Sequence, residues 1–464
     1  MKRTIFLFFI LVFSFSAFSQ DITGQWNGTL NVMGSDLPVV FNIEKTDNGY
    51  TSTMDSPDQG VKGIPCDEIS FLDNTLKIKI KSIRASYEGT LKNDSIVGIF
   101  KQMMIKKPLT LSREEVEKVE MKRPQEPKPP FPYYSEEVKF VNKRDGNTLA
   151  GTLTLPRKKG KFPVVVLISG SGPQNRDEEL LGHKPFLVIA DFLTRNGFGV
   201  LRYDDRGTAQ STGDFSKATT LDLSYDAESA VEFLLGRKDV SHKKIGLIGH
   251  SEGGMIAPIV ASRNQNVAYI VLLAGPGVRG DKLLLMQQRA VAVASGAPES
   301  AVSANEKLNA PLFECIINAI DTVNLRADLI KLLEKGVNEN QELKSQLSDE
   351  QRSEMVKMTV SQLTSPWMIN FIKYDPYPTL KKVKCPTLAL NGSKDLQVPA
   401  SKNLSEIKRA FKESGNDKLT AIELPNLNHL FQETTTGLPT EYGEIEQTFS
   451  PKALNEILIW LKKR

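Results

Sequence analysis

Residues 244–260 read KIGLIGHSEGGMIAPIV, and this stretch decides the fold. The apolar run at 245–248 predicts a buried strand, and the apolar residues from Met255 onward predict a helix. Between them, the glycines of the GHSEG motif permit a sharp strand-to-helix turn that lifts the Ser251 side chain above the sheet edge. The motif alone arises by chance in many chains, so its specificity comes from the strand and the helix around it. Ser251 is therefore the candidate nucleophile.

Strands and helices alternate on both sides of this motif. Apolar runs predict strands at 164–168, 199–203, 244–248, 268–273 and 387–390, and amphipathic stretches predict helices at 186–193 and 221–235. Alternation of this kind over 135–464 predicts an α/β fold with a doubly wound, mostly parallel sheet. Residues 276–372 are helical in character and contain no convincing strand, which predicts a helical cap over the active face.

The first part of the chain has a different pattern. Over 20–112, short alternating runs such as 76–81 are separated by turn residues, which predicts a small all-β, barrel-like domain of about seven or eight strands. The Gly-Gln-Trp start at 24–26 suggests a ligand or glycan module, and a purely structural companion domain is the alternative. Prolines crowd into 113–134, so this segment is predicted to be a semi-rigid linker.

The N-terminus carries a targeting signal. Lys2 and Arg3 precede an apolar run at 5–13, and small residues follow at 17–19. This order predicts a signal peptide at 1–19 and an exported protein, periplasmic or extracellular. An uncleaved anchor would need a longer apolar run, so we expect no membrane span after processing.

Composition narrows the classes of partner. The 464 residues are 40% hydrophobic and carry a formal net charge of +4, which gives no electrostatic reason to expect nucleic acid or an anionic membrane. Cys66, Cys315 and Cys385 are scattered, so they predict neither a disulfide framework nor a metal site and are expected to be small buried hydrophobes. We expect a small-molecule ester substrate, no metal and no cofactor; the oligomeric state stays open.

A serine nucleophile needs a base, and the chain has only four histidines. His429 follows a strand-like segment near the C-terminus, where this topology places its base. His250 adjoins Ser251 and should point elsewhere, and His242 precedes a strand at the wrong end of the sheet. His183 lies in a loop and is the only rival.

The base in turn needs an acid that fixes its tautomer. Asp395 lies just past a strand end, where a turn-forming aspartate would look similar. The order Ser251, Asp395, His429 is the hydrolase order, and three roles in sequence are more specific than one motif.

The oxyanion hole requires two backbone N–H donors. We assign one to Ser171, in the turn after the strand at 164–168, and the other to Glu252, which follows the nucleophile. Gly172 is the alternative to Ser171 as the donor. Gly172 is also expected to line the substrate pocket. The competing interpretation is that the run at 169–173 forms a turn and has no catalytic role.

Two further groups of residues lie near the expected site. Trp367, Met368 and Phe371, at the far end of the cap, are candidates for lining an acyl pocket, although core packing is the commoner role of such residues. Residues 203–207 are expected to hold a turn by hydrogen bonds and an ion pair, and are kept out of the catalytic set.

These motifs resemble the α/β-hydrolase superfamily, and within it bacterial carboxylesterases that join an N-terminal β domain to a capped hydrolase domain. The matching stretches are 170–173 with 176–177, 202–204 with 206–207, 249–254, 365–367 with 374–376, 391–392 with Asp395, and His429. The resemblance implies hydrolysis of short- to medium-chain carboxylic esters without a cofactor. It also implies the roles of nucleophile, acid and base for Ser251, Asp395 and His429.

Two other functions compete with an esterase. Related serine aminopeptidases use the same triad, but they need acidic residues to hold a substrate amino group, for which Asp177, Glu178 and Glu179 are candidates. An exported protein with an inert hydrolase fold, whose β domain binds a glycan or lipid, is the third hypothesis. The complete triad argues against it.

Overall fold

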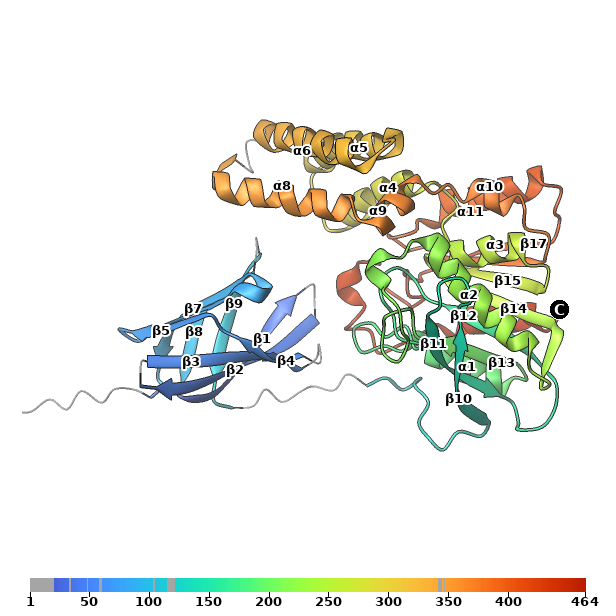
Figure 1. The fold of residues 1–464 in the computed structure, drawn as a ribbon, viewed down its shortest axis with the longest axis horizontal. Helices are drawn as coiled ribbons and strands as arrows, with labels where there is room; N and C mark the ends of the chain where they lie inside the picture. The colour runs from blue at the N-terminus through green and yellow to red at the C-terminus, as the bar shows by residue number, and fades with distance from the viewer. Residues whose placement is uncertain are drawn as a thin grey trace, which may run out of the picture. The chain divides into compact units, whose positions relative to one another are not determined.

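The computed structural model describes residues 21–32, 35–47, 49–57, 61–102, 105–114, 122–340, 344–345 and 347–464. The chain divides into two compact units, 1–120 and 121–464, called here the β unit and the α/β unit (Figure 1). The predicted signal peptide lies outside the described residues. Within the described ranges, no helix has the length and apolar character that crossing a bilayer requires.

The β unit is a nine-stranded antiparallel half-barrel with the strand order β4-β3-β2-β1-β9-β8-β7-β6-β5. Its strands are β1 Gly24–Val32, β2 Ser35–Thr46, β3 Gly49–Ser56, β4 Val61–Pro65, β5 Glu68–Leu72, β6 Thr75–Ile80, β7 Ala85–Lys92, β8 Ser95–Gln102 and β9 Ile105–Ser112. The all-β, barrel-like prediction is confirmed, with more strands than expected. Each pair of adjacent strands in this order consists of strands that follow one another in the chain, apart from the β1–β9 pair that joins the two ends of the segment.

Large side chains fill the interior of the β unit. Trp26, Phe41 and Tyr87 are almost fully buried, and the rings of Phe41 and Tyr87 stack with centroids 5.9 Å apart. Gly89 and Gly98 lie under the Tyr87 phenol, so a Cβ at either position would collide with it. The Tyr87 hydroxyl donates to the Ile96 carbonyl at 2.8 Å. The inward-facing side chains therefore pack against one another, as in small barrels with a filled interior.

The α/β unit is built on an eight-stranded sheet in the order β10-β11-β13-β12-β14-β15-β16-β17. Its strands are β10 Tyr134–Val141, β11 Thr148–Leu155, β12 Phe162–Ile168, β13 Gly199–Tyr203, β14 Val240–His250, β15 Val267–Leu273, β16 Thr387–Gly392 and β17 Leu419–Leu424. The strands from β13 to β17 pair in parallel, and an antiparallel β10–β11 hairpin extends the sheet beyond β13. The prediction of a doubly wound, mostly parallel sheet is confirmed.

Helices cover both faces of this sheet. Along β12, Val164 and Val166 pack into one core with α2 Thr220–Leu235, α3 Gly253–Arg263 and α11 Ala400–Glu413. Val165 and Leu167 pack into the other core, with α1 Pro185–Arg195 and α12 Pro451–Leu461. Because both faces are buried, the strands are apolar at successive positions rather than alternating.

A helical cap is inserted between β15 and β16 (Figure 1). It contains α4 Gly280–Ala294, α5 Glu299–Asn318, α6 Thr322–Glu339, α8 Asp349–Leu363 and α9 Pro366–Lys373, and the short α10 Tyr377–Leu380 leads back to the sheet. Leu312, Phe313, Ile316, Leu329 and Leu333 form part of a core that belongs to the cap itself. The chain leaves β15 at its carboxyl end, which is the sheet edge where β14 ends in the GHSEG turn.

Part of the predicted linker belongs to the α/β unit. The Arg123 guanidinium donates to carbonyl oxygens of loops 181–182 and 443–445 at 2.7–3.3 Å. The Gln125 amide donates to the Phe449 carbonyl at 2.6 Å. The second half of the stretch 113–134 is thus a strap fixed to the α/β unit rather than a spacer, because its side chains satisfy backbone acceptors of two loops.

The cysteine prediction needs a correction. Cys66, Cys315 and Cys385 are free thiols that are half-buried rather than buried. Each packs at the margin of a different core, one in the β unit, one in the cap and one beside the sheet. They therefore fill edges of the hydrophobic cores.

Candidate active site

The GHSEG turn has the geometry of a nucleophile elbow. β14 ends at His250 and α3 begins at Gly253, and Ser251 between them has a left-handed φ of 51°. A serine pays steric strain in this region, and such strain concentrates at functional sites. A Cβ at Gly249 would collide with the Gly253 carbonyl, so the tight turn requires glycine there. The predicted strand–turn–helix context of Ser251 is present.

The loops after β16 and β17 bring the candidate acid and base together. His429 Nδ1 lies 2.9 Å from Asp395 Oδ2, and both side chains are buried. The other carboxylate oxygen, Oδ1, accepts two backbone N–H groups of its own loop at 2.8 and 2.9 Å. The His429 ring lies 4.9 Å, centroid to centroid, from that of His250, which directly precedes Ser251. With Nδ1 facing the carboxylate, Nε2 is the nitrogen left for proton transfer.

The rival base, His183, is engaged elsewhere. Its ring is buried, with Nδ1 3.0 Å from the Thr448 hydroxyl and Nε2 2.8 Å from the Tyr442 carbonyl. Burial lowers the pKa of His183 to about 4, which keeps the ring neutral. His183 therefore fixes the loop at 442–448 and is not poised to serve Ser251.

Two buried carboxylates hold the turn that follows β12. Glu178 Oε1 accepts the Gly170 N–H at 2.7 Å. Asp205 accepts the Gln174 N–H at 2.9 Å and the Ser169 hydroxyl at 3.0 Å. Burial raises the pKa of Asp205 well above its usual range, and these hydrogen bonds offset part of the rise. The turn is thus fixed on both sides of its central residues.

The backbone N–H groups at the centre of this turn, and that of Glu252 in the elbow, are free to bind a substrate oxygen. In the described part of the chain, no acceptor takes the backbone N–H of Ser171, Gly172 or Glu252. Backbone donors held in place without an internal acceptor are what a developing oxyanion requires. This arrangement is compatible with the predicted donors Ser171 and Glu252, and it leaves Gly172 as an alternative.

The acidic run beside this turn is used inside the protein. Asp177 forms an ion pair with the buried Arg202, Glu178 bonds His250 Nδ1 at 2.9 Å, and Glu179 accepts from the Asn175 amide at 3.1 Å. Glu178, predicted only as a candidate for holding a substrate amino group, instead bonds the histidine that precedes Ser251. The signal in the sequence is the charged run at 176–179, in which Asp177 and Glu178 have partners far away in the sequence while Glu179 bonds the nearby Asn175.

The side chain of Glu252 adds a link that the sequence did not predict. It is buried and accepts hydrogen bonds from the Thr220 hydroxyl at 2.6 Å and from the Trp367 indole at 2.9 Å. Burial raises the pKa of Glu252, while donors that include the Ser171 hydroxyl lower it. Because Trp367 lies on α9, this carboxylate connects the cap to the residue that follows the candidate nucleophile.

The predicted pocket residues separate into two groups. Trp367 and Phe371 stack with centroids 5.0 Å apart and pack in a cluster with Met255, the third residue of the elbow helix α3. Met368 packs against the core of the cap instead. One turn of α9 therefore directs Trp367 and Phe371 toward the elbow and Met368 away from it.

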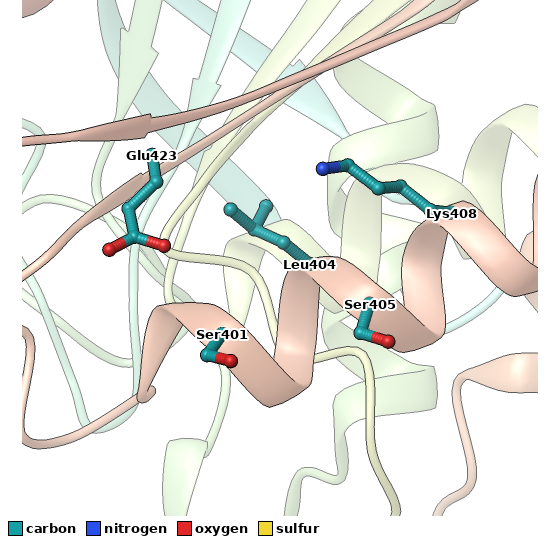
Figure 2. A pocket seen from close by; sticks show the side chains of 5 residues that line it. All are labelled: Ser401, Leu404, Ser405, Lys408 and Glu423. Carbon is teal, nitrogen blue, oxygen red and sulfur yellow. The ribbon is translucent and has the colours of Figure 1, made fainter.

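A surface depression of about 340 Å³ lies away from these residues. Figure 2 shows its lining, Ser401, Leu404, Ser405 and Lys408 on α11 with Glu423 on the edge strand β17. None of the candidate catalytic residues lines it. Among the described residues, no group of three or more His, Cys, Asp or Glu side chains is placed to hold a metal ion.

Comparison with known families agrees with this geometry. Residues 145–429, more than half of the chain, match the family described as X-Pro dipeptidyl-peptidase (S15 family). The chain belongs to this family. The matched segment of this S15-family chain contains Ser251, Asp395 and His429.

Relatives extend the match to the whole chain. Esterase EstD of Thermotoga maritima is 25% identical over 482 aligned positions that cover 100% of both proteins. A mitochondrial acyl-coenzyme A thioesterase 2 of Rattus norvegicus is 31% identical over 140 residues, 30% of this chain and 27% of its own. Together with the S15 family, the full-length relative identifies the chain as a hydrolase of the α/β-hydrolase superfamily, as predicted.

Solved structures are similar to part of the chain. The α/β hydrolase GrgF from Penicillium sp. sh18 aligns with a TM-score of 0.44 and 16% identity over 71% of this chain and 98% of its own. The Pyrococcus furiosus esterase Pf2001 aligns with a TM-score of 0.42 and 15% identity over 71% of this chain and 91% of its own.

Proposed function

We propose that this protein is an exported serine hydrolase that cleaves carboxylic esters through an acyl-enzyme on Ser251. The observation that carries the proposal is the buried contact of 2.9 Å between His429 Nδ1 and Asp395 Oδ2, beside the strained elbow that holds Ser251. The full-length similarity to a protein named an esterase supports ester rather than amide substrates.

The residues divide the reaction between them. His429 Nε2 takes the proton of the Ser251 hydroxyl as the oxygen attacks the ester carbonyl, and Asp395 stabilises the charged ring. The backbone N–H groups of Ser171 and Glu252 stabilise the oxyanion of the tetrahedral intermediate. His429 then returns the proton to the leaving alcohol, which leaves the acyl group on Ser251. Water, activated by the same ring, releases the acid and restores the hydroxyl.

Replacement of the nucleophile tests the proposal. We expect Ser251→Ala to abolish turnover of short p-nitrophenyl esters and labelling by a fluorophosphonate probe, because no other group would carry the acyl chain. Ser405→Ala, an exposed serine on α11, is the matched control and should retain both. Undiminished turnover by Ser251→Ala would refute serine catalysis at this position.

Peptide hydrolysis is the second candidate, because the matched family is described as a peptidase. A substrate amino group would need a carboxylate with a free face. The candidates Asp177, Glu178 and Glu179 already have partners within the protein, which favours esters. Parallel assays with an acetyl ester and an aminoacyl amide distinguish the two, since a peptidase would turn over the amide faster.

Export is proposed on the sequence of residues 1–19 alone. Expression of the full chain in a Gram-negative host, followed by fractionation and N-terminal sequencing, tests it. We expect a mature protein that begins near residue 20 in the periplasm or the medium. An intact Met1 in the cytoplasm would contradict export.

A further inference from the structure

His250 has an acceptor on each of its two ring nitrogens. Nδ1 lies 2.9 Å from Glu178 Oε1, and Nε2 lies 3.0 Å from the carbonyl oxygen of His429. A carbonyl oxygen never donates, so Nε2 must carry a proton. A neutral imidazole has only one N–H, and an ionised carboxylate facing Nδ1 requires the second. A neutral ring that accepts at Nδ1 from a protonated Glu178 would satisfy both contacts, and so does an imidazolium beside an ionised Glu178, the form proposed below.

The surroundings of the pair support this charge distribution. Glu178 and Asp395 are the carboxylates that act on His250, and the rings of His429 and Phe431 also lie close to it. Burial alone favours the neutral ring, but Glu178 in particular raises the pKa of His250 above its usual value. An ion pair in so buried a place is costly unless its hydrogen bonds are complete, and here each ring nitrogen has its acceptor.

The pair connects the three loops that the proposed reaction needs. Glu178 Oε1 also accepts the Gly170 N–H at 2.7 Å, at the start of the oxyanion turn. His250 is the residue before Ser251, and its Nε2 holds the backbone of His429. The hydrogen bonds of the Glu178–His250 pair thus link the oxyanion turn, the elbow and the loop of the proposed base.

We propose that His250 is a permanently charged positioning residue for His429. The proposal rests on the function proposed above. The His250 imidazolium fixes the His429 carbonyl, and its charge, 4.9 Å from the His429 ring between centroids, opposes protonation of that ring in the resting enzyme. This charge acts on the His429 ring together with the Asp395 carboxylate, which lies 2.9 Å from Nδ1, so its removal should be seen in the pH dependence of turnover. Glu178 is the counter-ion that keeps the charge in place.

His183 provides a contrast within the same protein. It is equally buried, but Nδ1 faces the Thr448 hydroxyl, which can donate as well as accept. One N–H is enough there, and the ring is neutral. The two buried histidines should therefore differ in charge although they differ little in exposure.

The first experiment measures that charge without reference to activity. Long-range ¹H–¹⁵N spectra of the full chain resolve the protonation of ring nitrogens, and four histidines make assignment by His→Gln variants practical. We expect both nitrogens of His250 to be protonated from pH 6 to 8 and one nitrogen of His183 to be protonated throughout. A neutral His250 ring at pH 7 would overturn the proposal even if the enzyme is active.

The second experiment measures the consequence for catalysis. Glu178→Gln keeps the shape and an acceptor for Gly170 but removes the counter-ion, so His250 should lose its charge. We expect the acid limb of the kcat/KM profile for a p-nitrophenyl ester to move upward by about one pH unit. Glu179→Gln, the same change at the exposed neighbouring position, is the control and should leave the limb in place.

The outcomes separate the two proposals. An acid limb that stays in place in folded Glu178→Gln would overturn the role of His250 and leave serine catalysis intact. Loss of Ser251-dependent turnover in the native protein would instead refute the proposed function, while the spectra would still report the charge of His250. If Glu178→Gln does not fold, the spectra of the native chain decide.

Discussion

The two units of the chain bury very different chemistry. In the described part of the β unit, the buried polar side chains are Asn27, Ser52 and Ser56, none of which carries a charge. The α/β unit buries many ionisable groups, among them Glu178, Arg202, Asp204, Asp205, Arg206, Asp226, Glu252, Asp395 and His429. Most of them lie at or after the carboxyl ends of strands, where the elbow meets the loops that carry the candidate acid and base.

The difference in buried charge between the two units shows where the α/β unit bears a cost in folding free energy. Burying a charge costs free energy unless partners compensate for it, and apolar side chains of similar volume are often the more stable choice. Among its described residues, the β unit buries no charged side chain. The α/β unit departs from this pattern at one edge of its sheet, and perturbed carboxylates gathered in one place indicate a functional site.

The largest expected effect comes from the acid of the proposed triad. Asp395→Asn should lower kcat by about four orders of magnitude, because an amide no longer holds His429 in the tautomer that accepts the serine proton. Steady-state kinetics with a p-nitrophenyl ester measure it. Asp417→Asn, at an exposed position, is the control and should be unchanged. A loss below tenfold would remove Asp395 from the triad.

A smaller effect is expected where the cap meets the elbow. Trp367→Phe keeps the aromatic stack but removes a donor to the buried Glu252, so the free energy of unfolding should fall by about 2 kcal/mol and kcat/KM by about tenfold. Denaturant unfolding and ester kinetics measure the two quantities. A double-mutant cycle with Glu252→Gln should show coupling between the positions; additive effects would mean that this hydrogen bond does not matter.

Stability should improve where a carboxylate is buried without a cation. The raised pKa of Asp205 means that its protonated form stabilises the fold below the ordinary aspartate pKa, and that this stabilisation is lost as the pH rises through the raised value. Asp205→Asn, which can still bond Gln174 and Ser169, should therefore unfold at a higher temperature than the native protein at pH 8. The advantage should disappear near pH 4. Calorimetry across this range checks the sign, and a constant difference would contradict it.

The smallest effect on activity is expected in the β unit. Tyr87→Phe removes a buried hydroxyl and leaves the Ile96 carbonyl without this donor, which should cost that unit about 1 kcal/mol. Because two units can unfold separately, calorimetry should show a shift in one transition only. Ester kcat/KM should not change. A changed kcat/KM would mean that the β unit takes part in the reaction.

Local pattern predicted the framework of the fold well. Strand β13 occupies the predicted residues, the strand-like segment before His429 is β17, and the elbow lies between the predicted strand and helix. Asp395 and His429 lie 2.9 Å apart, because parallel strands present their carboxyl ends at one edge. These successes depend on periodicity and on topology, which a sequence carries directly.

What could not be predicted is the choice of distant partners. Glu178 was a candidate for a substrate amine and instead bonds His250, 72 positions away. Arg123 lies in the predicted semi-rigid linker, and its guanidinium donates hydrogen bonds to backbone carbonyls more than 300 residues further along the chain. Met368 and Trp367 are neighbours on α9, yet Met368 packs into the core of the cap and Trp367 packs toward the elbow helix. Such pairings depend on three-dimensional proximity, which neither composition nor spacing encodes.

The left-handed backbone at Ser251 has an evolutionary consequence. Glycine enters this region of conformational space without steric cost, so Ser251→Gly would relieve about 1 kcal/mol of strain while it removes the oxygen of the proposed nucleophile. The simplest silent descendant of this protein is therefore under no thermodynamic handicap. Only continued selection for turnover would keep the hydroxyl in the lineage, and a gene copy released from that selection could drift into a folded, inert protein by a single codon change.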